Sequence, residues 1–273
     1  MVMSNSHREK IFYLVAYVLI GLLLVSCTSK ESVSRVAVLG SPAYAVVSEV
    51  AGHGEIVNAT PVGSDPHYME FTPSVAKVLE QSKAVIALGT SADRKIAREL
   101  SKPKLFLLPE GLEDPHVWLS PKRVMEWVPR IQSFLDEQFP GNKDLHAENA
   151  KTFMGVLWEL DAQFERLSGY CFVTQHPAFA YVEHDYGWRV LGTLEIGEAE
   201  ISPNQLIALM ETLKSEKNCL LLLNPYEPSK TAEVLKEQLS LPWAYFDILE
   251  VATRNYSFIM TENIDGVLNA LGQ

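Results

Sequence analysis

Short apolar runs alternate with helical segments along most of the chain, and this alternation restricts the fold more than any other feature. The runs predicted as strands are residues 35–41, 55–61, 84–90, 104–109, 171–176, 189–196, 219–224 and 244–249. Continuous Val, Ile and Leu runs, bounded by Gly, Pro and Ser and spaced by helices, are typical of parallel sheets. We therefore expect an α/β protein with two lobes, each a four-stranded, mostly parallel sheet flanked by helices.

A long helical stretch separates the two sets of strands. Residues 143–168 contain no strong helix breaker except Gly155, and their apolar residues recur at every third or fourth position. This period is that of an amphipathic helix. We expect the helix to join the lobes, and the predicted boundaries are an N-terminal lobe at 35–142, a connecting helix at 143–169 and a C-terminal lobe at 170–273.

The first 34 residues have the pattern of an export signal followed by a tether. Arg8 and Lys10 precede the apolar run 11–25, which is shorter than the ~20 residues that a spanning helix needs. A basic segment, an apolar segment and then small residues are typical of a secretory signal. The sequence LVSC at 24–27 resembles the bacterial lipobox, in which cleavage before the cysteine leaves it lipidated. We expect a signal peptide at 1–26, a lipid on Cys27 and a tether at 27–34; the alternative is an ordinary membrane anchor.

The charge of the chain excludes one class of partner. The formal net charge is −11, and loss of the signal peptide, whose charged residues sum to +1, gives −12. Nucleic-acid phosphates would repel such a chain, so we expect no nucleic-acid partner. The acidic balance is compatible with cationic cargo, although many proteins are equally acidic.

Two cysteines, Cys171 and Cys219, remain beyond the predicted lipidation site. Each begins an apolar run, so each is expected near the start of a strand. An exported protein can form a disulfide, but a bond between neighbouring parallel strands is sterically awkward. We expect two free, buried thiols, with a disulfide as the alternative.

The tripeptide Asp-Pro-His occurs twice, ending at His67 and at His116. Proline restricts the backbone before each histidine and limits the freedom of the loop. Asp65 and Asp114, the first residues of the two tripeptides, have two readings of equal weight: they orient the imidazoles, or they only form the turn before proline. His53, His146 and His184 lack such a context, and we interpret them as solvated.

Four candidate ligands follow predicted strands, where open α/β sheets bind their ligands. They are His67 and His116 after the second and fourth strands of the first half, and His176 and Asp247 at the ends of the first and fourth strands of the second half. Three imidazoles and a carboxylate suit a divalent transition metal: zinc, with iron, copper or nickel as alternatives, or manganese where oxygen ligands dominate.

The chain resembles the metal-binding cluster of solute-binding lipoproteins that supply zinc or manganese ABC importers. The stretches that carry the resemblance are 63–89, 114–121 (DPHVWLSP), 175–188 (QHPAFAYVEHDYGW), 200–217, 245–250 and 255–271. The resemblance implies a bilobed fold with a rigid connecting helix and one buried metal between the lobes. It places the metal ligands at His67, His116, His176 and Asp247, with Glu250 as the rival carboxylate.

Two departures from the family's pattern affect these expectations. Asn224 stands where many relatives carry a glutamate, and residues 91–113 lack the histidine-rich loop of many zinc-specific relatives. The presence of His176, which manganese-preferring members frequently replace by a carboxylate, favours zinc. We therefore expect Zn²⁺, with Mn²⁺ or Fe²⁺ as the alternative.

The function expected from the sequence is capture of a divalent metal outside the cytoplasmic membrane and its delivery to an ABC permease driven by a cytoplasmic ATPase. We expect a monomer, held by its lipid at the cell membrane, in the periplasm or on the outer face. The chain has no Walker-type or HExxH motif, so we expect no enzyme activity. A zinc hydrolase and a metal-dependent adhesin are the less favoured alternatives.

Overall fold

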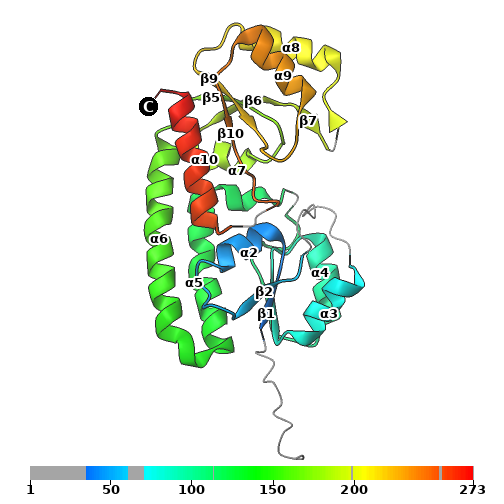
Figure 1. The fold of residues 1–273 in the computed structure, drawn as a ribbon, viewed down its shortest axis with the longest axis vertical. Helices are drawn as coiled ribbons and strands as arrows, with labels where there is room; N and C mark the ends of the chain where they lie inside the picture. The colour runs from blue at the N-terminus through cyan, green and yellow to red at the C-terminus, as the bar shows by residue number, and fades with distance from the viewer. Residues whose placement is uncertain (1–34, 61–70, 113, 198, 252–253, 273) are drawn as a thin grey trace, which may run out of the picture. The chain divides into compact units, whose positions relative to one another are not determined.

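The computed structural model describes residues 35–60, 71–112, 114–197, 199–251 and 254–272. The predicted signal peptide, Cys27 and the tether lie outside these residues, as do Asp65 and His67. The described part of the chain contains two four-stranded parallel sheets flanked by helices (Figure 1). The predicted fold class is confirmed.

The first sheet has the strand order β2-β1-β3-β4. Its strands are β1 (Val36–Leu39), β2 (Ile56–Asn58), β3 (Ala84–Ala87) and β4 (Lys104–Phe106), and the helices between them are α2 (Ser41–Val47), α3 (Pro73–Gln81) and α4 (Ser91–Arg98). All strand pairs are parallel. Alternate residues of β1 and β3 belong to two different hydrophobic clusters. The sheet is therefore covered on both faces, which explains the unbroken apolar runs in the sequence.

The second sheet has the order β10-β9-β5-β6 and is also parallel. Its strands are β5 (Cys171–Thr174), β6 (Arg189–Thr193), β9 (Cys219–Leu223) and β10 (Trp243–Tyr245), and its helices are α7 (Ala180–Tyr186), α8 (Pro203–Leu213), α9 (Lys230–Leu239) and α10 (Tyr256–Ala270). A small antiparallel sheet pairs β7 (Glu195–Ile196) with β8 (Ala199–Glu200).

The single strand predicted at 189–196 is divided into β6 and β7. Leu194 lies between them and donates its N–H to Thr174 O at 2.9 Å. Thr174 is the last residue of the neighbouring strand β5. Beyond that point β5 offers no further strand partner, and the chain pairs with β8 instead. The apolar run continues through this change of partner, so the sequence alone gave no sign of it.

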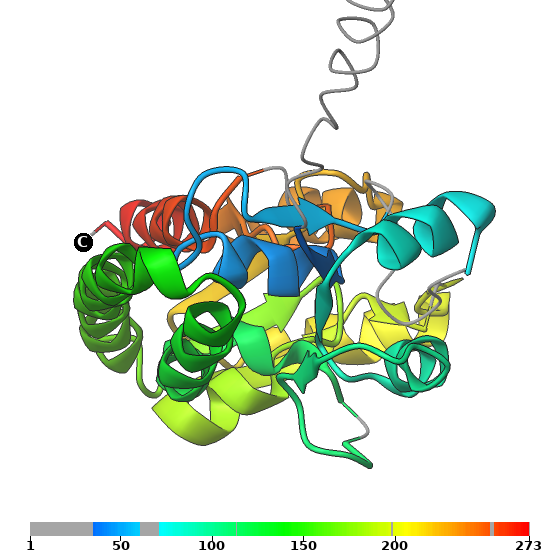
Figure 2. The same ribbon diagram turned by 90° about the horizontal axis from the view of Figure 1, so that it is seen from below.

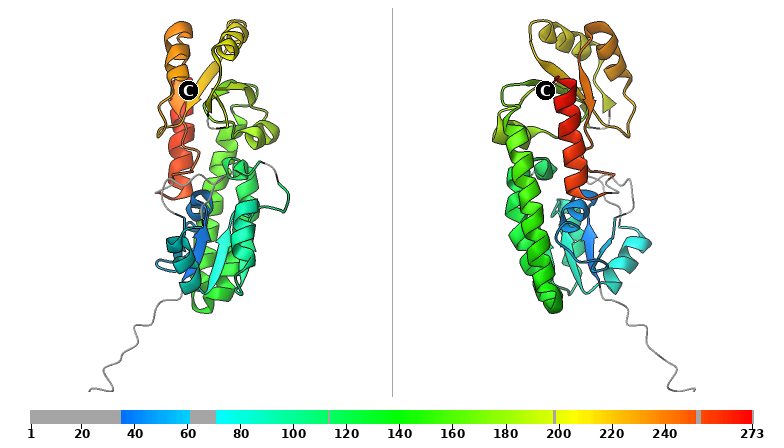
Figure 3. Two further views of the ribbon diagram at one scale, coloured as in Figure 1. Left: turned by 90° about the vertical axis from the view of Figure 1, so that its right-hand side faces the viewer. Right: turned by 60° about the vertical axis from the view of Figure 1, so that its left-hand side comes forward.

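The long helix α6 (Lys143–Glu165) packs against two other long helices. They are α5 (Pro121–Gln138) and α10, and Figures 2 and 3 show α6 beside each of them. The apolar face of α6 buries Phe153, Leu157, Leu160 and Phe164. These residues belong to one hydrophobic cluster that contains residues of both sheets. The lobe boundaries at 142 and 170 stay a prediction.

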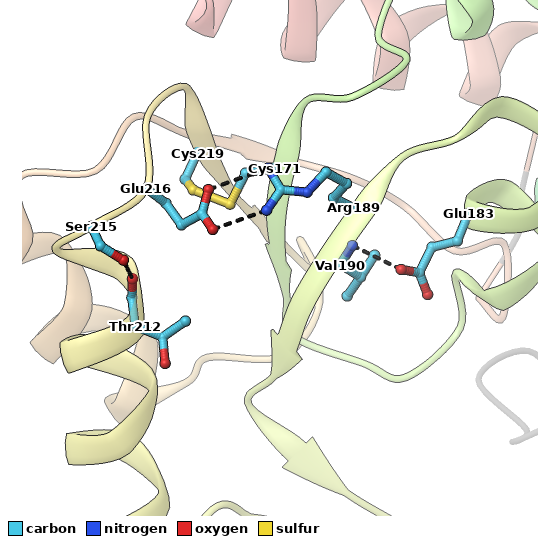
Figure 4. The surroundings of a disulfide bond; sticks show 8 residues. All are labelled: Cys171, Glu183, Arg189, Val190, Thr212, Ser215, Glu216 and Cys219. Carbon is cyan, nitrogen blue, oxygen red and sulfur yellow. Dashed lines mark hydrogen bonds and ion pairs between the residues drawn. A yellow bond between two sulfur atoms is a disulfide. The ribbon is translucent and has the colours of Figure 1, made fainter.

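The expectation of two free thiols is wrong. Cys171 and Cys219 form a disulfide with an S–S distance of 1.99 Å (Figure 4). They are directly paired in the register of the neighbouring strands β5 and β9, with Cα atoms 4.3 Å apart. Both side chains belong to the same buried cluster. The pairing therefore follows from strand register, which the sequence does not reveal.

The prediction that His146 is solvated is also wrong. Its side chain is fully buried in the first turn of α6, with Nδ1 2.7 Å from Asp136 Oδ1 and Nε2 2.9 Å from Glu55 Oε2. His53 and the side chain of His184 are exposed, as predicted. None of the helices in the described ranges has the length and apolar character that crossing a membrane requires.

Candidate metal centre

Three potential ligands converge from segments that follow three different strands. His116 begins the 3₁₀ helix η1 (His116–Leu119) after β4, His176 follows β5, and Glu250 follows β10. One ligand atom of each lies within 4.8 Å of the other two. Glu250 Oε1 is 3.7 Å from His116 Nε2 and 4.0 Å from His176 Nε2. His176 and Glu250 follow parallel strands of the second sheet, whose carboxyl ends lie at one edge, and η1 brings His116 to them from the end of a strand of the first sheet.

The spacing and burial of these atoms suit a cation with tetrahedral coordination. Zinc–nitrogen and zinc–oxygen bonds of about 2.0–2.2 Å place neighbouring tetrahedral ligands about 3.3–3.6 Å apart. The measured separations of 3.7 and 4.0 Å are slightly wider. Glu250 Oε1 is buried and has no hydrogen-bond partner among the described residues. A buried carboxylate oxygen that lacks such a partner is costly unless a cation compensates it.

Asp114 holds the imidazole of His116 from behind. Its Oδ1 lies 2.7 Å from His116 Nδ1 and also accepts the His116 backbone N–H at 3.0 Å. Burial alone would lower the pKa of His116, but the hydrogen bond with Asp114 and the nearby charges of Asp114 and Glu250 outweigh it and raise the pKa above its usual value. The contact with Asp114 leaves Nε2 directed at Glu250, on the opposite side of the ring.

Tryptophan and tyrosine side chains fix the segment that carries His116. Trp118 packs against the His116 ring, with centroids 5.1 Å apart, and donates its indole N–H to Ile248 O at 2.9 Å. Tyr256 OH donates to Trp118 O at 2.9 Å, and Tyr181 OH donates to Asp114 O at 2.9 Å. These bonds tie η1 to the segment after β10, and so keep His116 close to Glu250.

The predicted carboxylate ligand Asp247 lies outside the cluster of three that the described residues form. Its Oδ1 accepts the backbone N–H of Leu249 at 2.7 Å, and its Oδ2 accepts the hydroxyl of Tyr226 at 3.1 Å. Burial raises the pKa of Asp247, although these bonds oppose the shift. Leu249 adopts a positive φ of 66°, which few non-glycine residues adopt. Asp247 thus stabilises the tight turn that presents Glu250.

Sequence reasoning missed one polar group of this site. Glu195 Oε2 lies 3.4 Å from His176 Nδ1, on the side of the ring away from Glu250. Glu195 belongs to β7, which the sequence had joined to β6. His67 and Asp65, the remaining predicted residues, are outside the described part of the chain.

The sequence of the chain is similar to those of curated metal-binding lipoproteins. The chain is 27% identical over 311 residues to the zinc-binding lipoprotein AdcA of Streptococcus pneumoniae (strain R6), and the alignment covers 97% of this chain and 62% of AdcA. It is 24% identical over 306 residues to the metal ABC transporter substrate-binding lipoprotein SloC of Streptococcus mutans, with 97% and 99% covered. The chain thus spans about three fifths of the length of AdcA.

Solved structures show the same fold. The Zn(II)-bound ZnuA-like domain of Streptococcus pneumoniae AdcA superposes with a TM-score of 0.71 at 23% identity, covering 88% of this chain and 99% of that domain. In this chain, two parallel sheets carry the strands after which the imidazole and carboxylate groups of the cluster follow. The chain belongs to the family described as "zinc-uptake complex component A periplasmic", which matches residues 36–270.

Proposed function

We propose that the protein captures a divalent transition-metal ion, zinc in preference to others, and delivers it to an ABC permease driven by a cytoplasmic ATPase. The observation that carries this proposal is the buried Glu250 Oε1, which faces His116 Nε2 and His176 Nε2 and has no hydrogen-bond partner among the described residues. The metal is cargo, so the site has to release it as well as bind it.

The ligand set proposed is His116, His176 and Glu250, completed by His67. The structure supports Glu250 over Asp247 because both carboxylate oxygens of Asp247 already accept hydrogen bonds. His67 is proposed because it ends the same Asp-Pro-His tripeptide that positions His116. By the same analogy, Asp65 would support His67 as Asp114 supports His116.

Zinc fits this ligand set best. Three imidazole nitrogens and one carboxylate oxygen match its preference for nitrogen ligands and tetrahedral geometry, whereas manganese prefers a shell richer in oxygen. The family description and the printed name of AdcA both refer to zinc. Mn²⁺ and Fe²⁺ remain the alternative cargo. Four protein ligands leave no open position for a reactive water, so the site supports binding rather than hydrolysis.

We place the protein outside the cytoplasmic membrane as a monomer. Support comes from the predicted signal peptide, from the lipobox-like sequence at Cys27, and from the lipoprotein names of AdcA and SloC. A lipid on Cys27 would keep the loaded protein at the membrane that holds the permease. We propose residues 35–142 and 170–273 as the two lobes and 143–169 as the helix between them.

A competition titration with a fluorescent zinc chelator at pH 7.5 tests the site. Glu250→Gln removes the charge that faces both imidazoles, and we expect zinc affinity to fall about 100-fold or more, equivalent to about 2.7 kcal/mol. Asp247→Asn is the matched control, because the amide oxygen can still accept the Leu249 N–H; its affinity should fall less than about tenfold.

The opposite order of the two variants would assign the ligand to Asp247. Absence of stoichiometric zinc binding by the unaltered protein would refute the proposed function. His116→Ala should weaken binding at least as much as Glu250→Gln, since it removes a ligand nitrogen and leaves His176 as the only histidine of the three-residue cluster that faces the Glu250 carboxylate.

A further inference from the structure

The imidazole of His176 lies between two carboxylates that contact different nitrogens. Its Nε2 is 4.0 Å from Glu250 Oε1, within the proposed metal site. Its Nδ1 is 3.4 Å from Glu195 Oε2, and the Glu195 side chain is only 12% exposed. A neutral imidazole can bind a metal through Nε2 only if its proton is on Nδ1. Glu195 is therefore placed to select the tautomer that the metal requires.

The position of Glu195 is itself fixed by hydrogen bonds. Its Oε1 accepts a bond from the Gln175 side-chain amide at 2.9 Å, and the same amide nitrogen donates to Glu227 O at 3.0 Å. The side-chain oxygen Oε1 of Gln175 accepts the Asn224 backbone N–H at 3.1 Å. Gln175 is buried, so these bonds are shielded from water. The network connects the segment after β5 to the segment after β9.

The small sheet β7–β8 anchors the other side of Glu195. Glu195 pairs with Glu200 in the register of this sheet, and Glu200 Oε1 accepts bonds from Ser229 Oγ (2.7 Å) and from Thr231 N (3.2 Å). Ser229 is the N-terminal cap of α9. The sheet, labelled at β7 in Figure 1, is thus attached to a helix of the second sheet. The backbone that carries Glu195 has little freedom to move away from His176.

We propose that Glu195 is a positioning residue for metal binding: it holds the proton of His176 on Nδ1 and so presents Nε2 to the cation. Because a bound cation makes the Nδ1–H a stronger donor, the 3.4 Å contact should tighten when metal is present. This inference rests on the proposed function, since it assigns a role within the same site. Loss of such a support to a ligating histidine typically lowers the metal affinity about 10- to 100-fold.

The test compares Glu195→Ala and Glu195→Gln with a charge control, Glu227→Gln. Glu195→Gln keeps the shape of the side chain, but its amide has only one oxygen to accept the bonds that Gln175 and His176 donate to two. Burial and the charges of Glu195 and Glu250 raise the pKa of Glu227. The Glu227 carboxylate therefore interacts electrostatically with the same site. Glu227→Gln removes a nearby carboxylate and leaves the Glu195–His176 contact intact.

Two measurements are made on each variant at pH 7.5. In the zinc titration, we expect about 10- to 100-fold weaker binding for both Glu195 variants and less than about threefold for Glu227→Gln. In nitrogen-15 NMR of the metal-free protein, the ring signals that disappear in His176→Asn are those of His176. They should show the Nδ1–H tautomer. The Glu195 variants should shift it toward Nε2–H.

Each outcome decides between the roles. An unchanged His176 tautomer in both Glu195 variants would overturn the proposal, even if binding weakens, because a purely structural contribution would not move the proton. Equal weakening by Glu227→Gln would also overturn it, since general charge would then explain the effect. If the unaltered protein bound no zinc, the proposed function would fail; zinc binding unaffected by Glu195→Ala would refute only the present inference.

Discussion

The buried imidazole of His146 provides the sharpest stability prediction. Its two nitrogens contact Asp136 Oδ1 at 2.7 Å and Glu55 Oε2 at 2.9 Å, and its side chain is 0% exposed. Both ring nitrogens therefore contact carboxylate oxygens. The substitution His146→Leu has a similar volume and removes both donors while leaving two carboxylates behind.

The size of the stability loss depends on the hydrogen bonds and the solvent access that the two carboxylates retain in His146→Leu. Removal of the partner of a buried charged group typically costs about 3–5 kcal/mol, because the charge is left uncompensated. Glu55 still accepts bonds from Asn142 Nδ2 and Gly52 N, both at 2.6 Å, and the Asp136 side chain is 22% exposed and can turn toward water. We therefore expect the free energy of unfolding to fall by about 3 kcal/mol, the lower end of that range.

The assay is urea unfolding of the metal-free protein at pH 7, followed by circular dichroism. Replacement of His184, whose side chain is 78% exposed, by Gln is the control and should change stability by less than about 0.5 kcal/mol. A loss below about 1 kcal/mol for His146→Leu would refute the reasoning, because it would mean that the two carboxylates do not depend on the ring.

The pH dependence has a defined sign. Burial alone would raise the pKa of Glu55, but the hydrogen bonds from Asn142, His146 and Gly52 together lower it. A lowered pKa adds stability that is present above the unfolded value of about 4.3 and is lost as pH falls through the folded value. The difference between the unaltered protein and His146→Leu should therefore shrink below about pH 4.

Three further predictions concern other parts of the chain. Burial alone would raise the pKa of Asp185, but the hydrogen bonds with Arg123 and Ser120 lower it to about 2. The unaltered protein should therefore lose stability in urea unfolding between pH 5 and pH 2.5, and Asp185→Asn should lose less. The disulfide closes a loop with a sequence separation of 48, so the Cys171→Ala/Cys219→Ala double variant should be less stable by about 2–4 kcal/mol in urea unfolding. Zinc affinity should fall with acid by up to about one log unit per pH unit for each histidine ligand that protonates, starting below the raised pKa of His116; a flat affinity between about pH 5 and 7.5 would contradict imidazole ligation.

Much of the fold could be predicted because it depends on local patterns. The strands are short, apolar and bounded by turn residues, and the long helix α6 has a regular apolar face. Both patterns report burial on the two faces of a sheet or along one face of a helix. For the same reason the sequence placed His116 and His176 at strand ends, and the structure brings them to one place.

The parts that could not be predicted depend on contacts between distant segments. His146 and Glu55 are 91 residues apart, and no local signal in the sequence connects them. The hydrogen bond from Leu249 N–H to Asp247 forms in a turn with a positive φ at Leu249, which the sequence does not show. Glu195 lies in a two-residue strand, which is too short to show a period.

The most direct test of the account is anomalous diffraction at the zinc edge from crystals of the zinc-loaded protein. We predict one zinc ion within about 2.0–2.2 Å of His116 Nε2, His176 Nε2 and Glu250 Oε1, with His67 as the remaining ligand. A zinc ion bound elsewhere, or one that is coordinated by Asp247 and not by Glu250, would contradict the proposed centre.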